Sequence, residues 1–437
     1  MLRSTILSIF ALPLFAGGPP PTVGMQQNMA MQQNMTMQML MSRTRRLQAH
    51  SPRRQNETAM NSVAPVKGVS WQVHFTPGTP VVVDEELVLG FNGRSLAAHS
   101  RADGKLRWET TLEAEQEGSF LLTANLVIIP TEDYRVIALD RTTGKVRFSI
   151  QLEAMKRFLD SSNVKTRVQA TVEKDRLYIA THGKGGDGEA SGKLYAVDLA
   201  SGSKLWDVPL KAGADYAPIV LDDRIVVGGA PWLQAFSARE GKLHWQVQVN
   251  VGEWFMPGIE AGSRYWFTVG RKAVAVDLAN GEVVWQGKGG NGCASEGDRV
   301  FVMEPGFTKC TLVALAPLTG KRLWEHKDCY LVSPWVQEGM IYQVTPKGLA
   351  CFQVVDGKEV WLFPLDKRPP CPPMLMGGRL FVVTPDGSKT LLHVLDPKSG
   401  KEEWSVTIPV KASDEFPIAD AAGVVYPGTK GEVVCLK

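Results

Sequence analysis

The stretch "LYAVDLASGSKLW" at residues 194–206 decides the fold, because near-copies of it recur along the chain. It alternates apolar and other residues, reaches an aspartate, turns through small residues that include a glycine, and ends in a tryptophan. Alternation with a period of two predicts a β-strand, and the glycine turn predicts a tight reversal into a second strand. A recurring stretch of this kind is either a repeated cofactor site or a repeated structural element.

Eight copies of the ending are present, about forty residues apart except for one interval of 58. They end in an aromatic residue, at Trp108, Phe148, Trp206, Trp245, Trp285, Trp324, Trp361 and Trp404. Each unit has a short apolar strand, a turn, a β-branched strand, an alternating strand, and a glycine turn into the aromatic strand. Four antiparallel strands at this period are typical of a β-propeller blade. We therefore predict an all-β propeller of four-stranded antiparallel blades.

Two residue types in the repeat have structural explanations. The aromatic residue is expected to lie between neighbouring blades as a large apolar wedge. Asp140, Asp198, Asp277 and Asp396 precede a turn glycine by four residues, and their carboxylates can accept hydrogen bonds from the turn backbone. The repeat is therefore interpreted as a structural element.

The two ends of the repeat region predict how the ring closes. The last unit, from Pro417, stops before its aromatic strand, and "KGVSWQVHF" supplies an unmatched strand around Trp71. We expect this N-terminal strand to complete the last blade. The direct count is then nine, but most propellers have four to eight blades. We therefore expect eight blades, with one unit irregular or Trp71 outside the blade strands, and nine blades is the alternative.

The N-terminal region differs from the repeats. Residues 1–18 have an arginine, an apolar run and small residues, which predicts a secretory signal peptide. Residues 19–65 are rich in Met and Gln and then basic, which predicts a disordered linker before a propeller over 66–437. Residues 1–68 carry seven basic residues and one acid, so a net charge of +3 leaves −3 for the remainder. The main body thus has no electrostatic footprint for nucleic acid.

The repeat "LYAVDLASGSKLW" and its copies resemble the repeats of the PQQ-type β-propellers. That superfamily includes quinoprotein alcohol dehydrogenases and the BamB scaffold of outer-membrane assembly. The quinoproteins imply PQQ and Ca²⁺ beside a pair of adjacent cysteines, and this chain has no adjacent cysteines. We expect no PQQ, no calcium, no other metal and no catalytic residues. BamB implies a non-catalytic scaffold, although its lipid-anchored cysteine is missing here.

The resemblance favours an exported scaffold or binding module of the periplasm or cell envelope, with a protein or peptide partner on one ring face. The protein is expected to be a monomer or part of an envelope complex, without a transmembrane segment after signal cleavage. A quinoprotein-like oxidoreductase and an extracellular glycan- or peptide-binding sensor are the alternatives.

Candidate site residues lie where the units differ. Trp254, Trp335 and Arg271 fall near the entry to a first strand or in a turn, and they are our candidates to face a ligand. The long unit contains an insertion with His182, Lys184 and Asp187, whose spacing does not match a phosphate-binding P-loop. Packing within the blades and a flexible surface loop are the respective alternatives.

The six cysteines all lie in the C-terminal third and lack metal-site spacing. Export would permit disulfides, and Cys310–Cys329 is the pair to test first. Buried free thiols are the alternative.

Overall fold

Each sequence repeat forms one four-stranded antiparallel sheet, with strands adjacent in the order in which they follow along the chain. In the unit that contains residues 194–206, β12 (Gly192–Asp198) pairs with β13 (Lys204–Leu210), so that Ala196 faces Trp206. Most residues of β12 are buried on both faces of the sheet. A sheet with two apolar faces needs a neighbour on each side, which the ring provides.

The computed structural model describes residues 65–437 except 67, 118, 154–166, 183–191, 230, 250–257, 262, 270, 307–308, 331–333, 414–415 and 421–422. The predicted signal peptide and nearly all of the predicted linker lie outside the described residues.

The described strands form nine sheets, which we number as blades 1–9 and give from the first strand to the fourth. Blades 1 to 3 are β2 (Val82–Val83), β3 (Leu87–Asn92), β4 (Ser95–Ser100), β5 (Leu106–Thr111); β6 (Leu121–Leu122), β7 (Leu126–Pro130), β8 (Arg135–Asp140), β9 (Val146–Gln151); and β10 (Arg167–Glu173), β11 (Arg176–His182), β12, β13. Blades 4 to 6 are β14 (Ile219–Leu221), β15 (Arg224–Gly229), β16 (Trp232–Ser237), β17 (Leu243–Gln248); β18 (Ile259–Ala261), β19 (Arg264–Val269), β20 (Lys272–Asp277), β21 (Val283–Lys288); and β22 (Gly290–Glu296), β23 (Arg299–Pro305), β24 (Cys310–Leu315), β25 (Arg322–Cys329). Blades 7 to 9 are β26 (Trp335–Gln337), β27 (Met340–Thr345), β28 (Gly348–Gln353), β29 (Glu359–Pro364); β30 (Met374–Met376), β31 (Arg379–Asp386), β32 (Lys389–Leu395), β33 (Glu402–Ile408); and β34 (Ile418–Asp420), β35 (Gly423–Pro427), β36 (Glu432–Leu436), β1 (Val69–His74).

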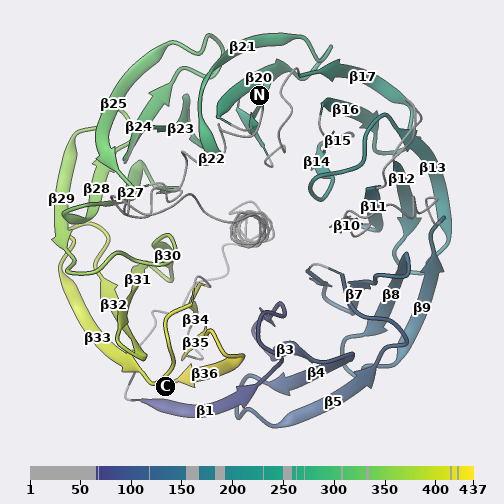
Figure 1. Cartoon of the computed structure of the whole chain (residues 1–437), viewed down its shortest axis with the longest axis horizontal. Helices are drawn as coiled ribbons and strands as arrows, with labels where there is room; N and C mark the ends of the chain where they lie inside the picture. Colours follow the sequence, from purple (N-terminus) through teal and green to yellow (C-terminus); the bar gives the residue numbers. More distant parts are fainter. Residues whose placement is uncertain are drawn as a thin grey trace, which may run out of the picture.

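The blades are arranged in a closed ring, with the first strand of each blade toward the centre and the fourth at the rim (Figure 1). β1 pairs antiparallel with β36, so that Trp71 faces Cys435 and His74 faces Glu432. The predicted closure by the N- and C-terminal strands is confirmed. The count is nine, the number reached by counting Trp71 as a blade strand.

The joints between blades are filled by apolar side chains. Between blades 1 and 2, for example, Leu89, Phe91, Val127 and Ile129 belong to one buried cluster. Such clusters recur around the ring and include residues of neighbouring blades. Burial of this apolar surface is the main force that holds neighbouring blades together.

The repeated aromatic residue joins each blade to the next. At eight of the nine joints its ring lies against the turn glycine of the following blade, and these glycines have φ values of 67° to 76°. They are Gly104, Gly144, Gly202, Gly241, Gly281, Gly320, Gly357 and Gly400. The exception is Trp404, because the third and fourth strands of blade 9, β36 and β1, are not joined by a turn. A Cβ atom at any of these glycines would lie within 2.9 Å of a ring atom. The glycine is therefore needed both for its left-handed backbone and for the space that the ring occupies.

Six of the tryptophans also bind the next blade through a hydrogen bond. The indole Nε1 donates to a backbone carbonyl oxygen at 2.9–3.1 Å, in the pairs Trp71–Arg101, Trp108–Arg141, Trp206–Arg239, Trp245–Leu278, Trp324–Val354 and Trp361–Pro397. Between blades 5 and 6 the corresponding carbonyl, of Pro317, accepts from Trp266 instead, whose ring is 5.0 Å from that of Trp285. The buried Nε1 of Trp404 has no partner among the described residues.

The turn aspartates also behave as predicted. Asp140, Asp198 and Asp396 accept backbone N–H bonds from Thr143, Ser201 and Ser399 at 2.7–2.9 Å. Asp277 accepts one from Ala279 at 2.7 Å. In the stretch at residues 194–206, Asp198 therefore stabilises its own hairpin turn, and Trp206 binds the neighbouring blade.

Candidate functional site

The connections between strands fall on two faces of the ring, because successive strands of a blade run in opposite directions. One face, which we call the turn face, carries the repeated glycine turns. The other, the loop face, carries the connections from second to third strands and from each blade to the next. Loop-face connections differ in length: Gly289 alone joins β21 to β22, whereas residues 112–120 join β5 to β6. Differences between units therefore gather on the loop face.

The described residues include no helix that is long and apolar enough to cross a membrane. Over the same residues, there is no group of three or more His, Cys, Asp and Glu side chains placed to hold a metal ion.

Three of the sequence-predicted site residues are described, and they lie on loop-face segments. Arg271 lies between β19 and β20, and Trp335 is the first residue of β26. His182 ends β11, at the same face. The other three, Trp254, Lys184 and Asp187, lie outside the described residues. Arg271 and Trp335 belong to blades 5 and 7, which are not neighbours in the ring.

Trp335 has a clear packing role. Its half-buried ring packs against the apolar clusters on both sides of blade 8, which contain Leu375 and Met374 respectively. Its Nε1 donates to Oε1 of Gln337 at 3.2 Å. The ring therefore supports three successive blades, and the ligand-facing role of Trp335 stays a prediction.

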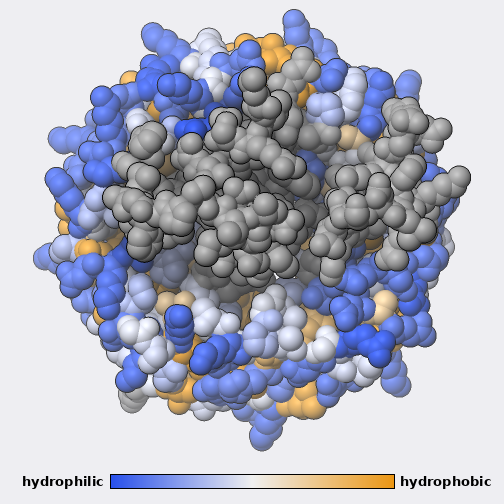
Figure 2. Space-filling model, in the orientation of Figure 1, coloured by the Kyte–Doolittle hydropathy of each residue, from blue (hydrophilic) through white to orange (hydrophobic). Residues whose placement is uncertain are grey.

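Arg271 belongs to a set of basic residues that sequence reasoning did not assemble. This set, which we call the basic arc, lies on loop-face segments of blades 5 to 8: Arg271, Lys272, Lys309, Lys347, Lys367, Arg368 and Lys389, all exposed. Lys309 is 3.2 Å from Asp328 and Lys367 is 3.8 Å from Asp386, in ion pairs. The guanidinium of Arg368 lies 4.7 Å from the ring centre of Tyr330. The surface of blades 5 to 8 that Figure 2 shows in colour is mostly hydrophilic.

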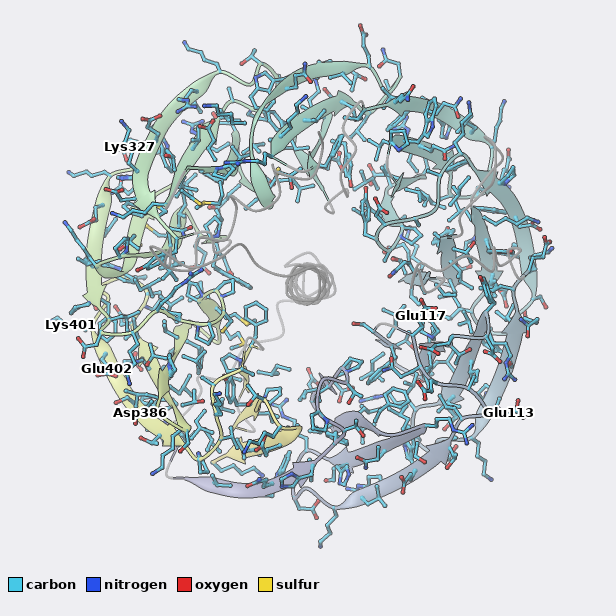
Figure 3. All side chains as sticks on the ribbon, in the orientation of Figure 1. Glu113, Glu117, Lys327, Asp386, Lys401 and Glu402 are labelled. Atoms are coloured by element: carbon cyan, nitrogen blue, oxygen red, sulfur yellow. The ribbon has the colours of Figure 1, made fainter. Side chains whose placement is uncertain are left out.

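An acidic counterpart, the acidic arc, lies on loop-face segments of blades 1 to 3. Its members are Glu113, Glu115, Glu117, Glu132, Asp133 and Glu153. It extends from the rim, at Glu113, toward the centre, at Glu117 (Figure 3). The backbone holds its two main segments together, since the N–H of Glu132 donates to the carbonyl oxygen of Glu115 at 3.0 Å.

Arg135 is the main countercharge of the acidic arc. It lies 2.6 Å from Glu113 and 2.5 Å from Asp133. Burial acts to raise the pKa of Asp133, but hydrogen bonds from Arg135 and Thr131 outweigh it and lower that pKa. Lys193 also lies 2.7 Å from Glu153. Arg135 and Lys193 together bring two positive charges to six acidic side chains, so the acids of the arc outnumber these partners.

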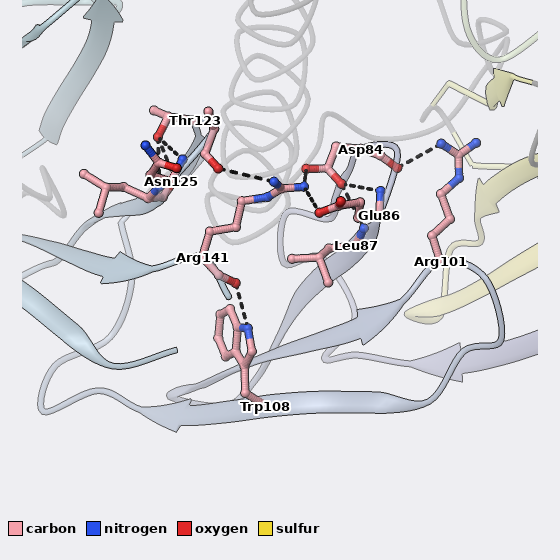
Figure 4. Close-up of polar contacts among 10 residues, drawn as sticks. Asp84, Glu86, Leu87, Arg101, Trp108, Thr123, Asn125 and Arg141 are labelled. Atoms are coloured by element: carbon pink, nitrogen blue, oxygen red, sulfur yellow. Dashed lines mark hydrogen bonds and ion pairs between the residues drawn. The ribbon is translucent and has the colours of Figure 1, made fainter. Parts of the chain in front are cut away.

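Polar residues of the turn face instead serve the joints between blades (Figure 4). Arg141 of blade 2 binds Asp84 and Glu86 of blade 1, at 2.6 and 3.0 Å. Nη1 of the buried Arg101 donates to the carbonyl oxygen of Asp84 at 2.8 Å, and Nη2 donates to that of Gly423 in blade 9 at 3.3 Å. These groups hold blades 9, 1 and 2 together around the closure.

Comparison with known proteins agrees with this architecture. The family model described as outer membrane protein assembly factor BamB matches residues 57–217, 167–288, 270–370 and 308–437. A protein of that name from Moranella endobia (strain PCIT) is 26% identical over 196 residues, which is 40% of this chain and 47% of the relative. The chain thus spans about half the length of that relative in the alignment.

Two solved structures are also similar. BamB from Moraxella catarrhalis matches with a TM-score of 0.49 and 16% identity, over 86% of this chain and 98% of that chain. The computationally designed Ika8 protein matches with a TM-score of 0.50 and 11% identity, over 80% and 99%. At 11% identity, the similarity to the designed protein supports the fold alone. The family model covers nearly all of the repeat region, and the chain therefore belongs to the family of outer membrane protein assembly factor BamB, among the PQQ-like β-propellers.

Proposed function

We propose that this protein is a non-catalytic scaffold of the cell envelope that binds a protein partner through its loop face. Export to the periplasm or envelope, as expected from residues 1–18, is part of the proposal. The family membership supports a role in protein assembly, because the family model and the curated relative carry that description.

The proposal rests on one observation: the repeated residues stabilise the ring, whereas the residues that differ between blades lie on the loop face. The repeated Trp, Gly and Asp side chains bind within and between blades. The residues that differ between blades gather on the loop face, where the basic and acidic arcs oppose each other across the ring. Complementary charge on a partner would fix its orientation and speed its association.

A binding experiment with charge-reversal variants tests the proposal. The tagged full-length chain is used to capture partners from a cell-envelope extract, before and after chemical crosslinking. The Lys347→Glu/Lys367→Glu variant reverses two exposed charges of the basic arc. We expect it to lose most of the captured partner, and the loss to shrink as salt rises, because exposed charges are screened.

A matched control reverses two exposed lysines of the turn face, in Lys145→Glu/Lys242→Glu. This control should retain the partner. Equal capture by both variants, or no captured protein at all, would count against the proposal. Incubation of the wild-type chain with PQQ and Ca²⁺ provides a further arm, in which a bound quinone spectrum with dye reduction would favour the oxidoreductase alternative.

A further inference from the structure

Two cysteines of blade 6 face each other directly. Cys310 begins β24 and Cys329 ends β25, and the register of this antiparallel pair places them opposite each other. Facing residues in such a pair have Cα atoms about 4.5–5.5 Å apart. A disulfide needs Cα atoms about 4.4–6.8 Å apart and side chains on the same face. The backbone of blade 6 therefore meets the main geometric requirements for a cross-strand disulfide.

The local backbone gives this pair room to adjust. A bulge separates it from the next pair of the ladder, Leu312 with His326. Asp328, within the bulge, has a φ of 63°, which few residues other than glycine adopt. The pair is also the last of the ladder, at the open end of the hairpin. Small shifts of either strand end would therefore disrupt few of the hydrogen bonds between β24 and β25.

In the described strand pairs, Cys310 and Cys329 are the two cysteines that face each other. In the described strand pairs, Cys293 faces Val302, Cys351 faces Tyr342 and Trp361, and Cys435 faces Trp71 and Val425. Cys371 lies outside the strands. Only Cys310 and Cys329 share a buried cluster, and both carry free thiols in the structure.

We propose that Cys310 and Cys329 form an intramolecular disulfide when the protein meets a disulfide oxidant, which makes blade 6 a redox-sensitive site. In the first step, the Cys310 thiolate attacks the oxidant's disulfide, forms a mixed disulfide and releases one thiolate. The Cys329 thiolate then attacks Sγ of Cys310 and releases the second. Two protein thiols are oxidised, the oxidant is reduced to two thiols, and the two protons end on those thiols.

The surroundings favour Cys310 as the first thiol to react. Burial raises the pKa of both thiols, that of Cys329 to about 11, but Arg368 and Arg271 of the basic arc act in the opposite direction on Cys310. Cys310 is also 5% exposed, whereas Cys329 is fully buried. Electropositive, partly accessible cysteines are the reactive ones.

The bond would act at the loop face. Lys309 and Asp328, which precede the two cysteines, already form an ion pair of the basic arc. A disulfide would hold the two strand ends next to that ion pair in fixed positions. The position of Lys309 in the basic arc would then depend on the redox state of the two cysteines. This inference goes beyond the proposed function and does not depend on it, because its test needs no partner.

Peptide mapping tests the proposal. The full chain is incubated in oxidised glutathione, and a second sample is refolded from urea in the same buffer, so that access to buried thiols does not limit the result. Remaining thiols are alkylated, and trypsin is added without reductant. Cleavage after Lys309, Lys321 and Lys327 places the two cysteines on separate peptides. We expect one linked species that is two hydrogens lighter than the sum of those peptides.

Variants make the outcome specific. Cys329→Ala should leave Cys310 as a mixed disulfide with glutathione, and Cys351→Ala should retain the link. Arg368→Gln should slow the first step several-fold. Both peptides recovered separately from the two samples, or linked to other cysteines, would overturn the proposal.

Discussion

Nη2 of Arg141 lies 2.6 Å from Oδ2 of Asp84, across the joint between blades 1 and 2 (Figure 4). Oδ1 of the same carboxylate accepts the backbone N–H groups of Glu86 and Leu87, each at 2.8 Å. Asp84 therefore orders its own turn and binds the neighbouring blade at once. The two side chains are 17% and 27% exposed, so solvent screens their attraction less than at an open surface.

A double-mutant cycle with Asp84→Asn and Arg141→Gln should reveal a coupling free energy of about 1 kcal/mol, in the upper range for partly exposed pairs. Asparagine retains one acceptor oxygen for the turn, so the cycle isolates the ionic contact. Urea unfolding at low and high salt would measure it. The exposed pair Lys105–Asp103 is the control, with coupling near zero. Additive effects at Asp84 and Arg141 would contradict the prediction.

Gly144→Ala should be far more destabilising than Gly93→Ala. Both glycines have positive φ, of 70° and 59°, so alanine carries a similar backbone cost at each, about 1 kcal/mol. A Cβ at position 144 would lie 2.5 Å from Cε3 of Trp108, whereas nothing lies within 4 Å at position 93. We expect a further loss of about 2 kcal/mol or more from displacing the indole. Equal urea midpoints for the two variants would show that the ring moves aside freely.

The sequence predicts the parts of the fold that are local and repeated. The glycine turn, the aspartate that accepts its N–H bonds and the aromatic strand occupy about ten residues, so each copy repeats the same signal. Closure was predictable because Trp71 continues the spacing of the repeat. The preference for eight blades came from the frequency of known propellers, which carries no information about this chain.

Contacts between distant units could not be predicted in the same way. That Trp266, rather than Trp285, donates to Pro317 depends on which indole reaches the carbonyl in three dimensions. Arg271 was selected as an isolated residue, whereas its effect on Cys310 requires blades 5 and 6 to be side by side. The register of Cys310 with Cys329 depends on a bulge that no local pattern marks.

Low pH should reduce the free energy of unfolding, partly because the turn aspartates become protonated. Side-chain and backbone hydrogen bonds from Thr143, Ser201 and Ser399 lower the pKa values of Asp140, Asp198 and Asp396, respectively. A lowered folded-state pKa means that the stabilisation is complete above the unfolded value of about 3.9 and is lost as pH falls through the folded value.

The triple variant with asparagine at these three positions should therefore lose stability at pH 7, and its stability should fall less steeply below about pH 4. Urea midpoints measured from pH 7 to pH 2 would test this. Asp222→Asn/Asp223→Asn supplies the control, because these two exposed aspartates lie in the β14–β15 turn, outside the repeated glycine turns. Parallel acid profiles for the wild type and the triple variant would refute the role of the turn carboxylates.

Trp361→Phe should cost more than Trp404→Phe. Nε1 of Trp361 donates to the carbonyl oxygen of Pro397 at 3.0 Å, and phenylalanine cannot replace that bond. Loss of such a bond costs about 0.5–1.5 kcal/mol, in addition to the smaller ring. The buried Nε1 of Trp404 has no partner among the described residues, so its removal relieves a desolvated donor and offsets the loss of packing. Urea unfolding of the two variants gives the difference directly. Equal losses would contradict the prediction, because they would mean that the hydrogen bond from Trp361 to Pro397 contributes nothing measurable.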